Sequence, residues 1–397
     1  MPTTTADDLP LDAATGLPPI DRGDVDADPA TPPPTDTPLW LRLVALAGVM
    51  LLFVVALEMM GDGIKGLGAD FAEGLLRATS NPLLGLVTGI VVTSLVQSSS
   101  TTTSLVVTLV ATGTLSVPNA IPVIMGANIG TTVTNTIVSM GHITQPDEFR
   151  RAMAGATVHD FFNWLSVVIL LPLELAFGVI SRPATALAAA LPGIDSARPG
   201  DTPFEAIAGF VSGLLGGVAW LTALVGLLFL FVALRYLVVI LKGFFLRRSE
   251  GALDKYVFGK PLVAMAFGMV LTFLVQSSSI TTSLVIPLIG AGVLTVRRVF
   301  PYMLGSNVGT TATAVLAALI AVARGEPEAQ AGLIVALCHT FFNVFGIALI
   351  YPVPAIREIP IRMAEFVGEL AFKNRVYAVA YLLGLFYVLP LALEFIL

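Results

Sequence analysis

Residues 96–104 read Val-Gln-Ser-Ser-Ser-Thr-Thr-Thr-Ser, in which seven hydroxyl side chains follow one amide. This polar run interrupts an apolar stretch at 81–115, and its first five residues recur at 275–279 inside a second apolar stretch at 259–295. Scattered serines can bond to their own helix or to a neighbouring helix. A run that occurs twice instead favours a ligand site, because buried polar groups without a partner cost free energy.

Two more motifs repeat in the same order. Asn-Ile-Gly-Thr-Thr at 128–132 returns as Asn-Val-Gly-Thr-Thr at 307–311, and His-Asp-Phe-Phe-Asn at 159–163 returns as His-Thr-Phe-Phe-Asn at 339–343. The offset is 179 residues for the first two motifs and 180 for the third. Three motifs at one spacing indicate that the chain consists of two related halves.

The composition is that of a membrane protein. Of the 397 residues, 56% are hydrophobic and 12% are charged, whereas about a quarter of the residues in a soluble domain are charged. Several apolar segments are long enough to cross a hydrocarbon core of about 30 Å. They lie at 39–60, 217–241, 333–351 and 376–397. Buried helices of a soluble enzyme would need polar faces that these segments lack, so we expect an all-α polytopic membrane protein.

Each half contains the same succession of elements. We expect a spanning helix, an amphipathic stretch, an apolar pair broken by Gln-Ser-Ser-Ser, a helix interrupted by Asn-x-Gly-Thr-Thr, and a last helix that carries His-x-Phe-Phe-Asn. The ranges in the first half are 39–60, 61–80, 81–115, 117–140 and 151–180, and those in the second half are 217–242, 243–258, 259–295, 297–321 and 330–353.

The apolar pair of each half is too short for two full crossings of about 20 residues each. It therefore predicts a re-entrant hairpin with Gln-Ser-Ser-Ser at its tip. Each half then crosses the membrane three times, so the second half starts on the opposite face and the two form an inverted repeat. The expected divisions are an acidic, Pro- and Thr-rich disordered tail at 1–37, the first repeat at 38–180, a connection at 181–216, the second repeat at 217–355, and an interfacial segment with a final transmembrane helix at 356–397.

Positive charge sets the orientation, because Lys and Arg concentrate in cytoplasmic segments. With the N-terminus inside, the predicted outer segments hold only Lys65, Arg77, Arg182, Arg198 and Arg324. The predicted cytoplasmic segments hold Arg150, Arg151, Lys242, Arg247, Arg248, Lys255, Lys260, Arg297, Arg298, Arg357, Arg362, Lys373 and Arg375. We therefore expect a cytoplasmic N-terminus.

The two hairpin tips predict a site for an anion. A returning half-helix presents unpaired N–H groups and the positive end of its dipole, and serine hydroxyls can donate as well as accept hydrogen bonds. The broken helices at Asn128 and Asn307 would add amides, free carbonyls and threonine hydroxyls, which suit a hard cation. No Lys or Arg lies within a repeated motif, so dipoles, hydroxyls and cations that bind with the anion must offset its charge.

Asp160 is the one acidic residue within a repeated motif, and its counterpart is Thr340. A carboxylate inside a membrane marks a functional site, so we expect Asp160 to bind a cation. Pairing with a neighbouring His or Asn for structure alone is the alternative. His159 and His339 are expected to be structural. Glu58 and Glu174 lie closer to helix ends, where hydration is easier.

The chain resembles the type II sodium-dependent phosphate cotransporters. The resemblance runs from about residue 81 to the end, apart from 181–216, and rests on VQSSSTTTSLVV, IPVIMGANIGTTVTNTIVSM, EFRRAMAGATVHDFFNWLSVVILLPLE, FLVQSSS, LGSNVGTTATAVLAAL, ALCHTFFN and YPVPAIREIPIRMAE. It implies import of inorganic phosphate with sodium through the plasma membrane, without an organic cofactor and without nucleic acid. It leaves the oligomeric state open.

The resemblance also implies roles for residues. Both tips would bind phosphate, through Gln97, Ser98, Ser99, Gln276, Ser277 and Ser278, and we add Asn128 and Asn307 from the broken helices. A sodium ion would be bound by Gln276, Ser277, Thr310 and Thr313. Electrogenic members of the family are similar at Ala154, Ala156 and Asp160, which implies that Asp160 helps to bind an additional sodium ion.

Three alternatives remain at this stage. The cargo could be sulfate, a carboxylate or another small oxyanion, because hydroxyls and dipoles do not select phosphate by themselves. An intramembrane enzyme could use Ser98 or Ser277 as nucleophile with His159 or His339 as base, although an enzyme does not need its site twice. A passive channel is disfavoured because rings of charged residues are absent from the motifs.

Overall fold

The computed structural model describes the chain except for residues 1–37, 68–78, 80, 192–202, 246–256 and 397. The predicted acidic tail and most of the two predicted amphipathic stretches lie outside the described residues. All secondary structure in the described part is helical, and six helices there are long and apolar enough to cross a membrane. They are Leu43–Ile64, Val117–His142, Pro146–Phe177, Val296–Ala323, Ala329–Ile350 and Val376–Leu393. The prediction of an all-α polytopic membrane protein is confirmed.

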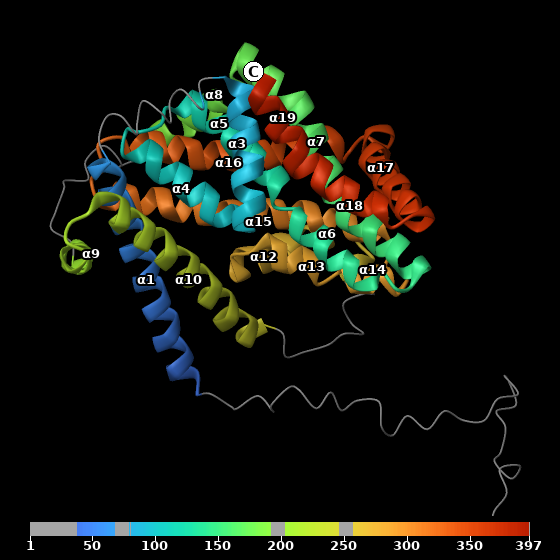
Figure 1. Cartoon of the computed structure of the whole chain (residues 1–397), viewed down its shortest axis with the longest axis horizontal. Helices are drawn as coiled ribbons and strands as arrows, with labels where there is room; N and C mark the ends of the chain where they lie inside the picture. The colour runs from blue at the N-terminus through green and yellow to red at the C-terminus, as the bar shows by residue number, and fades with distance from the viewer. Residues whose placement is uncertain (1–37, 68–78, 80, 192–202, 246–256, 397) are drawn as a thin grey trace, which may run out of the picture. The chain divides into compact units, whose positions relative to one another are not determined.

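The first spanning helix of each half is present. Helix α1 spans Leu39–Gly66 and α10 spans Ala219–Phe245. By their contacts, residues 44–397 form one unit, and residues 1–43 are assigned to another. Within the larger unit, α1 and α10 approach closely, because a Cβ atom on Gly226 would lie 2.7 Å from the main-chain nitrogen of Met60. Figure 1 shows the two helices side by side.

Both predicted hairpins form. In the first half, α3 (Pro82–Val96) turns into α4 (Ser99–Ala111), and in the second half α12 (Pro261–Val275) turns into α13 (Ser278–Ser283) and α14 (Ile286–Gly290). Asn81 caps α3 with its side chain, which accepts a hydrogen bond from the Leu83 N–H. The arms α3 and α12 each have 15 residues, which is about 22 Å of helix at 1.5 Å per residue. Such an arm is shorter than the hydrocarbon core.

Glycines allow each hairpin to pack closely against the helix that follows it. Helix α5 (Val117–Gly130) lies against α3, and α15 (Val296–Ala323) lies against α12. A Cβ atom on Gly130 would lie 2.6 Å from the carbonyl oxygen of Ile90, and one on Gly309 would lie 2.5 Å from that of Met269. Both glycines belong to a Gly-x-x-x-Gly spacing, which allows two helix backbones to touch.

The predicted break in the motif helix occurs in one half only. In the first half, α5 ends at Gly130 and α6 (Val133–Ser139) follows after two threonines. In the second half, α15 runs without a break through the Asn-Val-Gly-Thr-Thr motif, so the prediction of a broken helix there is wrong. The prediction took Gly305 and Gly309 as points of unwinding, whereas both lie in the close contact with α12, where a Cβ atom would meet the main chain of Met265 and Met269. The glycines of this motif serve close packing and no unwinding.

The remaining helices complete the fold. The motif His-x-Phe-Phe-Asn lies on α7 (Pro146–Phe177) and on α16 (Ala329–Ile350). The connection between the halves contains α8 (Ser181–Ala190) and α9 (Pro203–Leu214). After α17 (Pro354–Lys373), which packs along α7, the final segment consists of α18 (Val376–Leu383), the π-helical turn Gly384–Val388 and α19 (Leu389–Ile396). A short 3-10 turn, Met140–His142, precedes α7.

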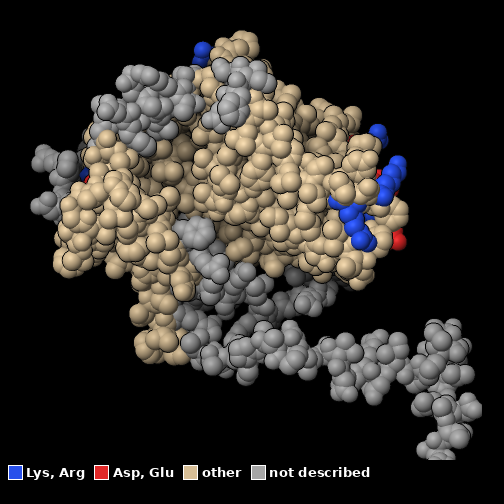
Figure 2. Space-filling model, in the orientation of Figure 1, with Lys and Arg blue, Asp and Glu red and all other residues tan. Residues whose placement is uncertain are grey.

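The described surface is suited to lipid. On the face shown in Figure 2, charged side chains are confined to the edges and the broad centre carries none. Large apolar side chains such as Leu262, Val168 and Val388 are exposed by 75%, 65% and 63%. Exposed apolar surface of this extent is expected where a protein faces hydrocarbon.

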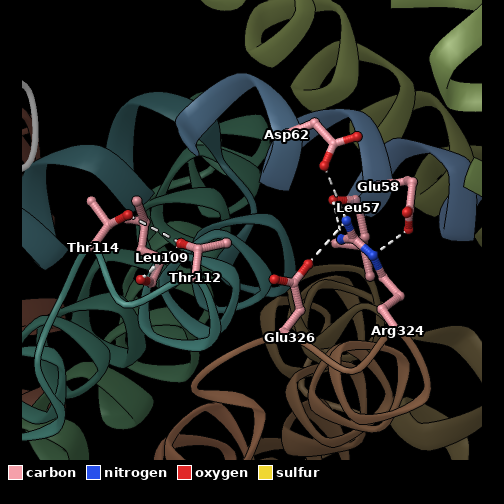
Figure 3. Close-up of polar contacts among 8 residues, drawn as sticks. All are labelled: Leu57, Glu58, Asp62, Leu109, Thr112, Thr114, Arg324 and Glu326. Atoms are coloured by element: carbon pink, nitrogen blue, oxygen red, sulfur yellow. Dashed lines mark hydrogen bonds and ion pairs between the residues drawn. The ribbon is translucent and has the colours of Figure 1, made fainter. Parts of the chain in front are cut away.

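Glu58 is buried, whereas the sequence predicted that it is easily hydrated near a helix end. Its side chain on α1 is 1% exposed and forms an ion pair with the guanidinium of Arg324, which follows α15. The same guanidinium contacts Glu326 at 2.9 Å and Asp62 at 3.4 Å, and it donates to the Leu57 carbonyl (Figure 3). Packing of α1 against the end of α15 excludes water from Glu58, which its position near a helix end could not indicate. Glu174 is partly exposed and accepts the N–H groups at the start of α8.

Candidate functional site

Each hairpin turns at its glutamine. Gln97 and Gln276 have φ angles of 57° and 55°, and among the described residues no other non-glycine residue has a positive φ. This left-handed conformation costs free energy for a residue with a side chain, so a polar residue kept there twice points to a function. The next residue is extended in both halves, and the hydroxyls of Ser98 and Ser277 accept the N–H of Thr101 and Ile280 at 3.2 and 3.4 Å.

The two glutamine side chains have equivalent partners. Gln97 Nε2 donates to the Ser94 carbonyl at 2.6 Å, and Gln276 Nε2 donates to the Phe273 carbonyl at 2.5 Å. The amide oxygens accept the hydroxyls of Thr134 and Thr313, at 2.8 and 2.5 Å. Thr134 and Thr313 occupy the same position in the two halves. We did not predict Thr134, although its offset of 179 residues from Thr313 was a usable signal.

The two turns lie against each other. The Ser100 hydroxyl donates to the main-chain carbonyl of Gln276 at 3.2 Å, and the Thr313 hydroxyl lies 3.5 Å from that of Ser100. On the other side, Thr282 and Ser283 of the second hairpin both donate to the amide oxygen of Asn135 at 3.0 Å. Each hairpin therefore contacts the helix that follows the other hairpin. Ser100 and Asn135 were not singled out from the sequence.

The two turns that carry the predicted phosphate ligands are in contact through Ser100 and Gln276. Ser99 and Ser278 begin the helices after the turns and are buried, whereas Gln97, Ser98, Gln276 and Ser277 are partly exposed. Ser99 lies at the N-terminus of the 13-residue helix α4, where N–H groups and the helix dipole favour an anion. The site thus contains hydroxyl and amide groups of both halves around one small region.

Asn128 and Asn307 have their amides engaged elsewhere. The amide oxygen of Asn307 accepts His159 Nε2, and its nitrogen donates to the amide oxygen of Asn163 at 2.9 Å. The amide oxygen of Asn128 accepts His339 Nε2 at 3.4 Å. Each asparagine therefore contacts the histidine motif of the other half. His159 and His339 are fully buried and join helices, as their structural prediction requires.

The predicted sodium ligands are partly assembled. Gln276 and Thr313 are in direct contact, and Thr310 lies one helical turn before Thr313 on α15. Ser277 follows Gln276 in the same turn. Together with the Gln276 carbonyl and Ser100, these residues supply uncharged oxygens, which are the ligands that a hard cation prefers. The described residues contain no group of three or more His, Cys, Asp or Glu side chains that could bind a metal ion.

Asp160 forms its hydrogen bond outside this oxygen cluster. Among the described residues, its hydrogen-bond partner is Tyr381, and neither Gln276 nor Thr313 bonds to it. It is fully buried on α7, and its Oδ2 atom accepts the hydroxyl of Tyr381 at 2.8 Å. Its Oδ1 atom is buried without a hydrogen-bond partner. The sequence pointed to Asp160 but gave no indication of Tyr381, which lies outside both repeats.

Comparison with known proteins identifies relatives. The family model described as Na+/Pi-cotransporter matches residues 52–182 and 228–351. Sodium-dependent phosphate transport protein 2A of Rattus norvegicus is 38% identical over 428 residues, which cover 88% of this chain and 67% of the relative. Sodium-dependent phosphate transport protein 2B of Homo sapiens is 37% identical over 448 residues, covering 88% and 64%. No solved structure matches the chain significantly.

Proposed function

Because the chain belongs to the Na+/Pi-cotransporter family, we propose that it is a symporter that imports inorganic phosphate with sodium through the plasma membrane. The chain spans about two thirds of the length of the rat relative. The observation that carries the proposal is the contact between the two Gln-Ser turns, through Ser100 and Gln276. A site shared by two related halves is what alternating access requires, since each half can open it toward one side.

Phosphate is bound at the facing turns. Gln97, Ser98 and Ser99 of the first turn and Gln276, Ser277 and Ser278 of the second turn supply its hydrogen-bond donors. The burial of Ser99 and Ser278 and the N-terminus of α4 support this assignment. Asn128 and Asn307 remain predicted ligands, and in the described conformation their amides support the site through the histidine motifs.

Sodium supplies the positive charge that the site itself lacks. Gln276, Ser277, Thr310 and Thr313 bind one ion through uncharged oxygens, and Asp160 helps to bind an additional ion. The repeated motifs contain no Lys or Arg, so phosphate binds weakly until sodium is present. Transport is electrogenic, because the additional sodium moves net positive charge inward.

The proposed membrane topology is the one that alternating access requires. The two halves are inverted with respect to each other, the hairpins are re-entrant, and the N-terminus is cytoplasmic. The shortness of α3 and α12 supports re-entrance, because neither arm is long enough to cross the core. The distribution of Lys and Arg in the sequence supports the orientation.

The contacts of the histidines argue against a serine enzyme. His159 and His339 bond to Asn307 and Asn128, and within the described part of the chain neither histidine forms a hydrogen bond with a serine of the turns. A serine nucleophile needs a base within hydrogen-bond reach. We therefore propose no catalytic activity.

The test is uptake of labelled phosphate into proteoliposomes under an imposed sodium gradient. Potassium in place of sodium is the control for coupling. Excess unlabelled arsenate should compete with phosphate, and excess sulfate should not. Uptake that persists in potassium would contradict sodium coupling, and stronger competition by sulfate would identify another oxyanion as the cargo.

A further inference from the structure

Tyr381 connects the final segment to the buried carboxylate. It lies on α18, and its hydroxyl donates to Asp160 Oδ2 at 2.8 Å. Asp160 is 0% exposed, and its other oxygen, Oδ1, has no hydrogen-bond partner. A carboxylate in such surroundings is costly, and a single charge-assisted hydrogen bond compensates only part of that cost. One oxygen is therefore held and the other remains available.

The contact breaks the symmetry between the halves. The position equivalent to Asp160 is Thr340, whose hydroxyl donates to the Ala336 carbonyl of its own helix. Helix α18 belongs to neither repeat. It therefore places a hydroxyl group against the one half of the duplicated fold that has a carboxylate at this position.

Neighbouring rings fix the orientation of Tyr381. Its ring centroid lies 6.0 Å from that of Phe161 and 6.2 Å from that of Phe386. The π-helical turn Gly384–Val388 follows α18 directly, and such turns are frequent at functional sites. Within this turn, the Tyr387 hydroxyl donates to the Ser94 carbonyl at 3.3 Å. That carbonyl also accepts Gln97 Nε2.

We propose that Tyr381 is a positioning residue for the sodium ion bound by Asp160. Its hydroxyl holds Oδ2 and so presents Oδ1 to the ion, which reduces the reorganisation that binding requires. This inference rests on the proposed function, in which Asp160 is a sodium ligand. The final segment is then a part of the transport site that the repeats do not contain.

The test is the sodium dependence of uptake by the full chain carrying Tyr381→Phe, which keeps the ring and removes the hydroxyl. The sodium concentration for half-maximal uptake should rise by about tenfold or more, as for a lost hydrogen bond to a charged group. The KM for phosphate at saturating sodium should change by less than about twofold, because the phosphate site itself is unchanged. General damage to the protein would instead alter both the sodium dependence and the KM for phosphate. Tyr377→Phe is the matched control, since Tyr377 lies on the same helix and is 51% exposed.

The same substitution in an Asp160→Gly variant distinguishes a positioning role of Tyr381 from a role in packing alone. With Asp160→Gly, adding Tyr381→Phe should cause no further shift of the sodium curve, because the partner of the hydroxyl is gone. An unchanged sodium curve in the single variant would overturn the proposal, as would an equal shift in both backgrounds. Failure of the proposed function looks different, because the unmodified chain would then show no sodium-dependent phosphate uptake at all.

Discussion

The hydroxyl of Ser100 donates a hydrogen bond to the main-chain carbonyl of Gln276, with 3.2 Å between the two oxygens. The two residues lie 176 positions apart in the chain and belong to different halves. The bond places the start of α4 directly against the turn of the second hairpin. Hydroxyl groups of both halves thereby lie close together, as the proposed phosphate site requires.

Ser99→Ala and Ser278→Ala should each abolish phosphate uptake while the protein still reaches the membrane. Each change removes a buried hydroxyl at the start of a helix that follows a turn. The measurement is sodium-driven uptake normalised to reconstituted protein. Ser116→Ala is the control, because Ser116 is exposed and its side chain makes no capping hydrogen bond. Normal uptake by both buried variants would refute the phosphate site.

Thr313→Val should raise the sodium concentration needed for half-maximal uptake by about tenfold, the effect of losing one ligand and its hydrogen bond. The hydroxyl of Thr313 contacts both Gln276 and Ser100. Thr311→Val serves as control, because its hydroxyl bonds only to its own helix, at Val308. The sodium activation curve is the readout. Equal shifts in the two variants would show that α15 responds to any loss of a hydroxyl and would exclude a specific ligand role.

Asp160→Gly should retain uptake but remove its dependence on membrane voltage. In the proposed mechanism, the additional sodium that Asp160 helps to bind carries the net charge of the transport cycle, so its loss leaves electroneutral transport. The measurement compares uptake with and without a potassium diffusion potential set by an ionophore. Uptake that still depends on the membrane potential in this variant would contradict the assignment of Asp160.

Arg324→Gln should destabilise the fold without touching the phosphate site. Glu58 and Glu326 are 1% and 8% exposed, and removing one partner of a buried ion pair costs about 3–5 kcal/mol. The expected result is a lower unfolding temperature in detergent, with Arg182→Gln at an exposed position as control. The double variant Arg324→Gln with Glu58→Gln should recover part of the loss. A double variant no more stable than the single one would disprove the pairing.

The sequence indicated the turns of the site better than their surroundings. Gln97 and Gln276 could be located because a polar run inside an apolar stretch has few structural explanations. Asp160 could be located because a carboxylate inside a membrane is costly. The break expected at Asn307 did not form, since the glycines that suggested unwinding serve close packing of α15 against α12. Tyr381 and the Glu58–Arg324 pair depend on which helices meet, and no local pattern records that.

The glycine contacts have a consequence for movement. Because Gly130 and Gly309 leave no space for even one more carbon atom between α3 and α5 or between α12 and α15, each hairpin arm and its helix should travel as a rigid block. Sliding of α3 along α5, or of α12 along α15, would force the two backbones to collide. Any hinge that exposes the cargo to alternate sides of the bilayer should therefore lie outside these two helix contacts.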